Sequence, residues 1–218
     1  KDKKKISSFD DEIFNMNFSK DVFMEGNFES EKYFSDIKHL IIEEFSFYNV
    51  EKYRKSPFFD ILSNDNAVSI CLRQNRFLEG KNNKNININT IESEKFSNEQ
   101  INYINKSINF FKDKINNPVF YIWSNDFYNF DDSKFNSPIN KVIHNSEFLQ
   151  QIDKRALDLF LISLCKNHIV IPSSFNWWGA WLSSHSDKII LRPSENFFST
   201  FEVNNKDFWP SDWIEIKP

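Results

Sequence analysis

Residues 169–182 read IVIPSSFNWWGAWL and contain one complete connection from a strand to a helix. The apolar run at 169–171 is typical of a buried strand, and residues 175–184 are predicted to form a helix. Ser173 and Ser174 lie between the two elements. A strand that leads directly into a helix is the repeating unit of a parallel α/β sheet.

The same alternation continues on both sides of this stretch. It predicts an α/β fold with a doubly wound parallel sheet, in which ligands bind beyond the carboxyl ends of the strands. The further predicted strands are 67–72, 119–123, 141–143 and 188–191, and the further predicted helices are 98–115 and 153–166.

Two segments stand apart from this pattern. Residues 27–48 place five apolar side chains at helical spacing, which predicts an amphipathic helix; they are Phe34, Ile37, Leu40, Ile41 and Phe45. Residues 80–89 (GKNNKNININ) are rich in Asn and are predicted to form an exposed loop.

Composition excludes some classes of protein. The formal net charge of the 218 residues is -4, so we expect no broad basic surface and no nucleic-acid partner. Cys71 and Cys165 lie in apolar runs, which predicts free buried thiols and a cytoplasmic protein. We find no apolar run of about 18 residues that could span a membrane. The sequence begins without Met, and we interpret it as a fragment of a longer chain.

Polar groups follow several predicted strands. A pyrophosphate could bind where Ser173 and Ser174 open a helix, since free backbone N–H groups and a positive dipole end meet there. The alternative is that Ser174 only caps the helix. Arg73 and Arg76 follow the strand at 67–72, where a guanidinium suits phosphate recognition; the alternative is a surface salt bridge.

Asp158 interrupts a nearly continuous apolar helix and therefore needs a partner. Arg73 or a backbone loop would be a structural partner, whereas a ribose or a base would be a functional one. Residues 124–126 (SND) offer short polar groups to a base or ribose, or form a turn. Both alternatives stay open from the residues alone.

Trp177 and Trp181 share one helix face, and Gly179 allows another backbone to approach between them. Core packing is one explanation, and an aromatic platform for a sugar or base is the other. The four histidines show no metal-ligand spacing, and the three glycines cannot build a phosphate loop. We therefore expect no metal and no bound cofactor.

These segments together resemble family 11 glycosyltransferases of the α-1,2-fucosyltransferase type over most of the chain. The resemblance rests on residues 158–182 (DLFLISLCKNHIVIPSSFNWWGAWL), on Lys188, Ile189 and Ile190, and on residues 208–214 (FWPSDWI). Residues 26–47 resemble the family's Gly-x-x-x-Ser-Glu-Lys-Tyr-Phe segment, and residues 120–126 resemble its Phe-x-Ile-Phe-Ser-Asp-Asp strand end.

The resemblance implies a two-domain GT-B-type fold with facing Rossmann-like halves, and inverting, metal-independent transfer from GDP-fucose. Residues 1–65 would be the remainder of the acceptor-side domain, and 66–218 the Rossmann-like donor domain. Arg73 would contact the diphosphate and act in catalysis, Ser173 and Ser174 would bind phosphates, and Asp126 and Asp158 would face the nucleoside. The remaining donor-binding residues would be Asn75, Arg76, Ser124 and Phe175.

The chain departs from the family pattern in two motifs. The His-x-Arg-Arg-x-Asp signature stands here as residues 71–76 (CLRQNR), which keeps Arg73 and loses the His, the second Arg and the Asp. The family's Gly-Gly-Leu-Gly-Asn-Gln loop is not in this sequence. The functional alternatives are therefore a different nucleotide-sugar donor, or a noncatalytic remnant that binds a nucleotide sugar or a glycan.

The expected partners are a nucleotide sugar and a glycan acceptor. The expected acceptor hydroxyl is that of a galactose in polysaccharide biosynthesis, and any contact with the membrane would be peripheral, through a lipid-linked acceptor.

Overall fold

The computed structural model describes residues 9–17, 19, 21, 23, 25, 28–45, 50–78, 86–150, 152–199 and 204–218. At its centre is a parallel sheet of six strands in the order β3-β2-β1-β4-β5-β6. This is the strand order of a Rossmann-type doubly wound sheet, so the predicted fold class is confirmed. The strands are β1 (Ala67–Leu72), β2 (Val119–Ser124), β3 (Ile139–Lys141), β4 (Asn167–Ile169), β5 (Ile190–Pro193) and β6 (Ile214–Ile216).

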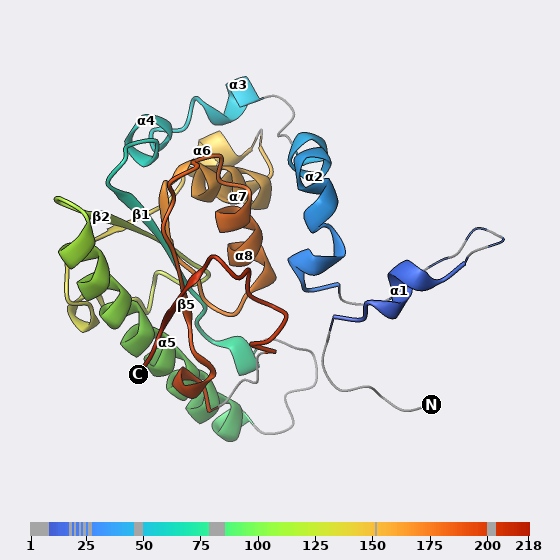
Figure 1. Ribbon diagram of the computed structural model, residues 1–218. Coiled ribbons are helices and arrows are strands. Elements are labelled where there is room, and N and C mark those ends of the chain that lie inside the picture. Colours follow the sequence, from blue (N-terminus) through green and yellow to red (C-terminus); the bar gives the residue numbers. More distant parts are fainter. Residues whose placement is uncertain are drawn as a thin grey trace.

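Helices cover both faces of the sheet. The long helix α5 (Ile86–Lys114) lies along one face, and α7 (Lys154–Leu164) and α8 (Ser174–Trp181) lie on the other (Figure 1). The remaining α-helices are α1 (Glu12–Asn15), α2 (Lys38–Glu44), α3 (Val50–Tyr53), α4 (Phe59–Leu62) and α6 (Ser146–Leu149). Short 3-10 helices are η1 (Glu31–Tyr33), η2 (Ser35–Ile37), η3 (Arg76–Leu78), η4 (Asp132–Lys134) and η5 (Glu195–Phe197).

The core forms between the sheet and its helices. All six residues of β1 are buried, as expected of a central strand that is covered on both faces. Two buried polar contacts cross the sheet region: Ser69 Oγ lies 2.7 Å from His168 Nδ1, and the Tyr103 hydroxyl donates to the Leu191 carbonyl over 2.7 Å. These bonds satisfy groups that would otherwise be costly to bury. Cys71 and Cys165 are free and buried, as predicted.

A second apolar cluster joins α8 to the segment that contains η1, η2 and α2. Trp177 stacks on Trp181 at 5.9 Å, and Trp178 lies between the rings of Phe34 (5.5 Å) and Phe45 (5.0 Å). The indole N–H groups of Trp177 and Trp181 donate to the Phe208 carbonyl and to Glu31. The structure therefore supports core packing for Trp177 and Trp181, because other side chains already cover their rings.

Gly179 allows α7 and α8 to pack closely. A Cβ atom at this position would lie 2.5 Å from Cγ2 of Ile162 on α7. The close neighbour is thus a side chain rather than the backbone that the sequence had suggested.

Several sequence predictions need correction. The described part of the segment 27–48, residues 28–45, is not one helix, because Phe34 leaves helical geometry between η1 and η2 and α2 begins only at Lys38; residues 27 and 46–48 lie outside the described residues. Ile37 and Leu40 remain almost half exposed, so they do not form the buried face that their spacing predicts. Residues 86–89 begin α5 instead of forming a loop, although Ile88 is more than half exposed; residues 80–85 lie outside the described residues.

Element boundaries also differ from the predictions. Strands β3 and β4 begin and end two residues earlier than predicted, and β5 begins two residues later. Strand β6 was not predicted, because it is only three residues long and too short to show a strand pattern. The division into domains at residue 65 stays a prediction, although all six strands lie after it.

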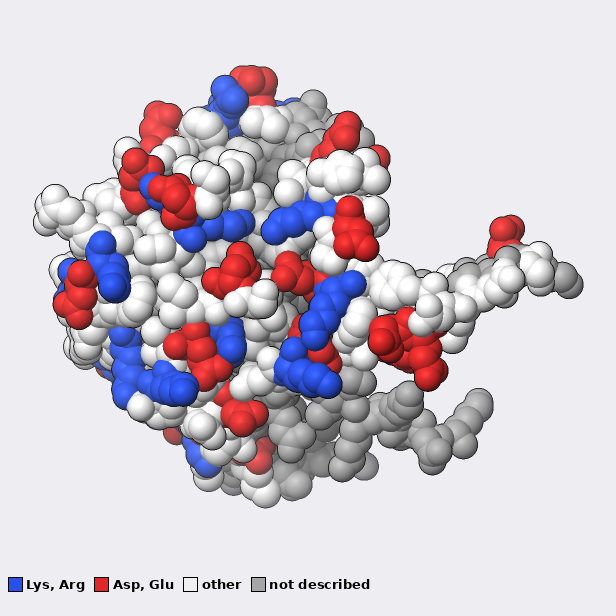
Figure 2. Space-filling view, in the orientation of Figure 1, with Lys and Arg blue, Asp and Glu red and all other residues white. Residues whose placement is uncertain are grey.

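Charges of both signs are mixed on the face shown in Figure 2, where no broad region of one sign is formed by the side chains drawn in colour. Among the described residues, no helix is long and apolar enough to cross a membrane.

Candidate functional site

The sheet order reverses between β1 and β4, since the chain passes from β1 outward through β2 and β3 and then returns to β4 on the other side. Ligands of doubly wound sheets bind at this switch point, beyond the carboxyl ends of the strands. A cavity of about 340 Å³ lies there. It is lined by Cys71, Leu72, Arg73, Trp123, Ser124, Asn125, Lys154, Arg155, Asp158, Ile171, Ser173, Phe175 and Asn176.

Arg73 leaves the end of β1 on a backbone that α5 holds in place. The side chain of buried Gln100 accepts from the Arg73 N–H (2.9 Å) and donates to the Arg73 carbonyl (2.8 Å). Because one side chain binds both backbone groups, the position of Arg73 at the cavity is fixed while its guanidinium stays exposed.

The loops after β1 and β2 are bonded to each other. Gln74 exchanges two backbone hydrogen bonds with the Asn125 side chain, at 2.7 and 2.8 Å, and its own side chain accepts from Ser124. Asn75 has a positive φ of 56°, which Asn tolerates better than most residues, and its amide donates to Asp126. The two strand ends are thereby held as one wall.

The carboxylate of Asp126 accepts hydrogen bonds that hold a turn. It accepts from the backbone N–H of Tyr128 and from the side chains of Asn75 and Asn129. The hydrogen bond from Asn129 is the main reason that the pKa of Asp126 is lowered. The structure thus shows the turn alternative for residues 124–126.

The start of α8 forms the opposite wall. Ser173 occupies the N-cap position, but its side chain makes no capping hydrogen bond in the described part of the chain. Ser174 is the first helical residue. Capping by a serine hydroxyl, the alternative to an anion site, is therefore not what the structure shows. The first-turn N–H groups of α8 lie at the edge of the cavity, where they favour an anion.

Asp158 lies in α7 with two partners that the sequence did not identify. His144 Nε2 is 2.7 Å from its Oδ1, and Lys154 Nζ donates to its Oδ2 over 2.6 Å. Lys154 is four residues earlier on the same helix, a spacing at which side chains meet. The structural partner is thus neither Arg73 nor a backbone loop. The buried carboxylate already has a cationic partner in Lys154.

The sequence profile of glycosyl transferase family 11 matches residues 1–217. The chain belongs to this family. It is 29% identical over 194 residues to an alpha-1,2-colitosyltransferase of Escherichia coli, which covers 88% of this chain and 61% of that protein. It is also 34% identical over 117 residues to the O-antigen biosynthesis glycosyltransferase WbnK of the same species, covering 53% of this chain and 36% of WbnK.

The chain thus spans less than two thirds of the length of these relatives. No solved structure matches it at a significant level. Membership of glycosyl transferase family 11 is consistent with a GT-B-type architecture, of which the observed sheet would be one Rossmann-like half.

Five of the nine predicted site residues of this family 11 chain line the switch-point cavity. They are Arg73, Ser124, Asp158, Ser173 and Phe175. The other four are outside its described lining: Asn75 and Asp126 join two loops, Arg76 begins η3, and Ser174 faces a smaller aromatic cavity beside Phe34 and Trp178.

The sequence reasoning missed four polar residues of the cavity. Lys154 and Arg155 at the start of α7 add two cations, and Trp123 and Asn176 add hydrogen-bond donors. The spacing of Lys154 and Asp158 was a usable signal, but nothing local distinguishes Trp123 or Asn176 from core residues.

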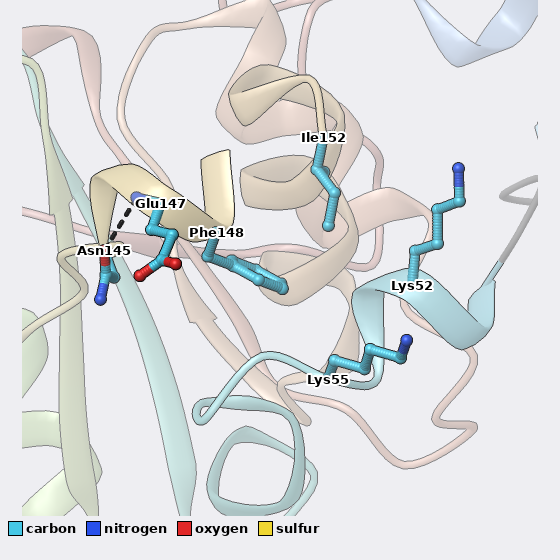
Figure 3. Close-up of a pocket in the computed structure, with 6 residues that line it drawn as sticks. All are labelled: Lys52, Lys55, Asn145, Glu147, Phe148 and Ile152. Carbon is cyan, nitrogen blue, oxygen red and sulfur yellow. Dashed lines mark hydrogen bonds between the residues drawn. The ribbon is translucent and has the colours of Figure 1, made fainter. Parts of the chain in front are cut away.

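A second cavity, of about 330 Å³, lies between α3 and α6 (Figure 3). Lys52 and Lys55 line one side, and Phe148 and Glu147 line the other. Both lysines are exposed, and the Asn145 side chain is already used to cap α6. We therefore take the switch-point cavity as the candidate functional site.

Proposed function

We propose that this chain is the donor-binding part of an α-1,2-fucosyltransferase-like enzyme of family 11, which transfers fucose from GDP-fucose to a galactose hydroxyl of a glycan. The observation that carries the proposal is the cavity at the switch point, which is lined both by Arg73 and by the start of α8, where Ser173 makes no capping hydrogen bond among the described residues. A diphosphate between them would meet a guanidinium on one side and backbone N–H groups on the other.

The proposed reaction needs little covalent chemistry from the protein. The acceptor hydroxyl oxygen attacks the anomeric carbon in line with the leaving GDP and its proton passes to solvent, while the bond from that carbon to the diphosphate oxygen breaks; the configuration therefore inverts and negative charge develops on the diphosphate. Arg73 and the start of α8 would stabilise that charge, which is the role that makes Arg73 catalytic in this proposal. Lys154 and Arg155 would add positive charge at the same cavity.

The proposed reaction uses no metal. Among the residues described, His, Cys, Asp and Glu side chains form no cluster of three that could hold a metal ion. Cations of the protein would instead balance the diphosphate, and activity in excess EDTA tests this point.

A second donor sugar is favoured by two observations. The relative that matches 88% of this chain is named as a colitosyltransferase, and the signature at residues 71–76 differs from the family pattern. We therefore propose a donor panel in which GDP-fucose competes with other GDP-linked deoxysugars and with UDP-sugars. The proposed acceptor is a glycan of the O-antigen type, in keeping with the printed name of WbnK.

The test has two stages. Thermal unfolding is measured with GDP, GDP-fucose and UDP in EDTA, because a ligand that binds only the folded state raises its stability. We expect a selective rise with GDP and GDP-fucose. Turnover is then measured for the parent and for Arg73→Ala in a chain of the relatives' full length, and we expect a loss of about a hundredfold or more.

Either stage can contradict the proposal. Turnover of Arg73→Ala within a few-fold of the parent would remove Arg73 from the mechanism. Tight GDP binding without turnover on any glycan would favour a noncatalytic binding protein. A matched control is Arg54→Ala, since Arg54 is an exposed arginine in the turn after α3 and is not among the cavity-lining residues.

A further inference from the structure

Two hydrogen-bond donors in the wall of the cavity are buried without an acceptor in the part of the chain that the structure describes. Trp123 Nε1 and Asn176 Nδ2 find no hydrogen-bond partner among the described residues, although the two residues are only 6% and 1% exposed. Both residues line the switch-point cavity. A buried donor without an acceptor is costly and uncommon, and a ligand that brings acceptor oxygens into the cavity would satisfy both donors.

The orientation of the Asn176 amide is fixed by the protein. Its Oδ1 accepts the backbone N–H of Ile171 over 2.8 Å, so the oxygen is committed and the NH₂ group is left as the free end. Asn176 is the third residue of α8, which has eight residues and, within the described ranges, no side-chain cap from Ser173. Its NH₂ group therefore adds a donor to a helix start that already favours an anion.

Trp123 differs from the other tryptophans whose indole bonds are seen. Trp177, Trp181 and Trp209 donate to the Phe208 carbonyl, to Glu31 and to Asn205, at 2.9 to 3.0 Å. Trp123 lies at the end of β2, next to Ser124 and opposite Cys71 of β1. Trp123 lines the switch-point cavity, whereas the other three tryptophans do not. The cavity is therefore the feature that distinguishes the indole without an acceptor.

The two donors belong to different ends of the cavity. Trp123 is on β2, whereas Asn176 follows β4, and β1 lies between these strands. Neighbouring strands are about 4.8 Å apart, so the two ends are separated by roughly 10 Å of sheet. A single phosphate is too short to serve both ends, whereas a nucleoside diphosphate is long enough.

We propose that Asn176 and Trp123 are specificity residues of the donor site: Asn176 Nδ2 donates to a phosphate oxygen at the start of α8, and Trp123 Nε1 donates to a hydroxyl or carbonyl oxygen of the nucleoside or sugar. This inference rests on the proposed function, because it needs a nucleotide in the cavity. It adds that the site selects a ligand with acceptor oxygens at both ends and rejects one that lacks either.

Calorimetric titration of four variants with inorganic pyrophosphate, GDP and GDP-fucose tests the inference. Asn176→Asp keeps the oxygen that binds Ile171 and replaces the donor by an anionic oxygen. Trp123→Phe keeps an aromatic ring and removes the N–H. The matched controls are Asn167→Asp and Trp209→Phe, since these side chains are equally buried but have their hydrogen-bond partners in the protein.

The expected results differ between the two residues. Asn176→Asp weakens binding of all three ligands by about tenfold or more, because a charged group opposes each phosphate. Trp123→Phe leaves pyrophosphate unchanged and weakens GDP by about tenfold if its acceptor is on the nucleoside, or GDP-fucose alone if its acceptor is on the sugar. The controls bind as the parent does.

Three outcomes overturn the inference. Binding by both variants within twofold of the parent, with GDP still bound by the parent, overturns this inference and leaves the proposed function standing. Equal losses in the control variants show that the effect comes from damaged packing. No binding of any nucleotide by the parent overturns the inference and the proposed function together.

Discussion

The two ends of helix α8 differ in the hydrogen bonds that they receive from the rest of the molecule. At its C-terminal end, Lys188 Nζ donates to three backbone carbonyls at 2.7 to 3.1 Å, those of Ala180, Trp181 and Ser183. At its N-terminal end, Ser173 makes no capping hydrogen bond among the described residues, and the Asn176 amide nitrogen has no partner there. The backbone carbonyls at the C-terminal end of α8 thus have a hydrogen-bond donor from within the protein. At the N-terminal end, which faces the cavity, the described residues leave hydrogen-bond donors without an acceptor.

The largest expected effect is a pH dependence near the satisfied end. Burial, with the nearby charge of Lys188, lowers the pKa of His168 to about 3, from an ordinary value of 6.5. Between these values the unfolded chain binds one proton more than the folded chain, so the free energy of unfolding falls as the pH falls, by at most about 1.4 kcal/mol per pH unit. His168→Gln should show a shallower loss between pH 6.5 and 5, measured by urea unfolding. Equal slopes in the parent and the variant would contradict this account.

Gly179, between the two ends, gives the next largest effect. Gly179→Ala should lower the free energy of unfolding by about 1 to 2 kcal/mol, because the clash with Ile162 outweighs the better helix propensity of Ala. Thermal or urea unfolding measures the loss. Ile162→Leu moves the branch away from Cβ and should restore part of the stability in the double variant. Additive losses would show that the contact is not the cause.

Removal of the cation at the C-terminal end tests the comparison directly. Lys188→Met should cost about 1 kcal/mol at pH 7, since three carbonyls lose a donor while the cost of burying a charge is also removed. Burial lowers the pKa of Lys188 to about 8 from 10.5, so the parent gains stability relative to the variant as the pH rises through this window. Urea unfolding at pH 7 and pH 9.5 measures both effects, with exposed Lys106→Met as the control.

The smallest effect on stability is expected at the N-terminal end. Ser173→Ala should change the free energy of unfolding by only a few tenths of a kcal/mol, because the Ser173 side chain makes no capping bond in the described part of the chain. Ser173→Asp should stabilise the helix slightly while weakening GDP binding by about tenfold, since its charge would oppose a phosphate. A loss of about 1 kcal/mol in Ser173→Ala would show that this end is capped after all and would remove the contrast.

Much of the fold could be predicted from local pattern. Buried strands such as β1 and β2 are short apolar runs, and α7 has clear helical spacing, so their positions were predicted to within a few residues. The segment 27–48 was misjudged because its spacing is helical, whereas Phe34 packs against the tryptophan rings of α8 and its backbone is not helical. Local spacing does not report a contact with a distant helix.

The location of the site could be predicted from the sequence, but the list of its residues was incomplete. Residues that follow strands could be expected at the ligand-binding edge, and Arg73, Ser124 and Ser173 do line the cavity. The role of Asp158 could not be assigned, because His144 reaches it from a separate segment. Trp123 and Asn176 were missed because a buried donor is recognised only when its partners are known.

The sequence by itself determined the alternation of strands and helices, the polar strand ends and the family motifs, since these depend on neighbouring residues. Only the tertiary structure decided which strand ends meet at one cavity, which carboxylates are already bonded, and which buried donors still need an acceptor. The physical reason is that hydrogen-bond satisfaction is a property of all the groups around an atom, and the fold brings those groups together from distant parts of the chain.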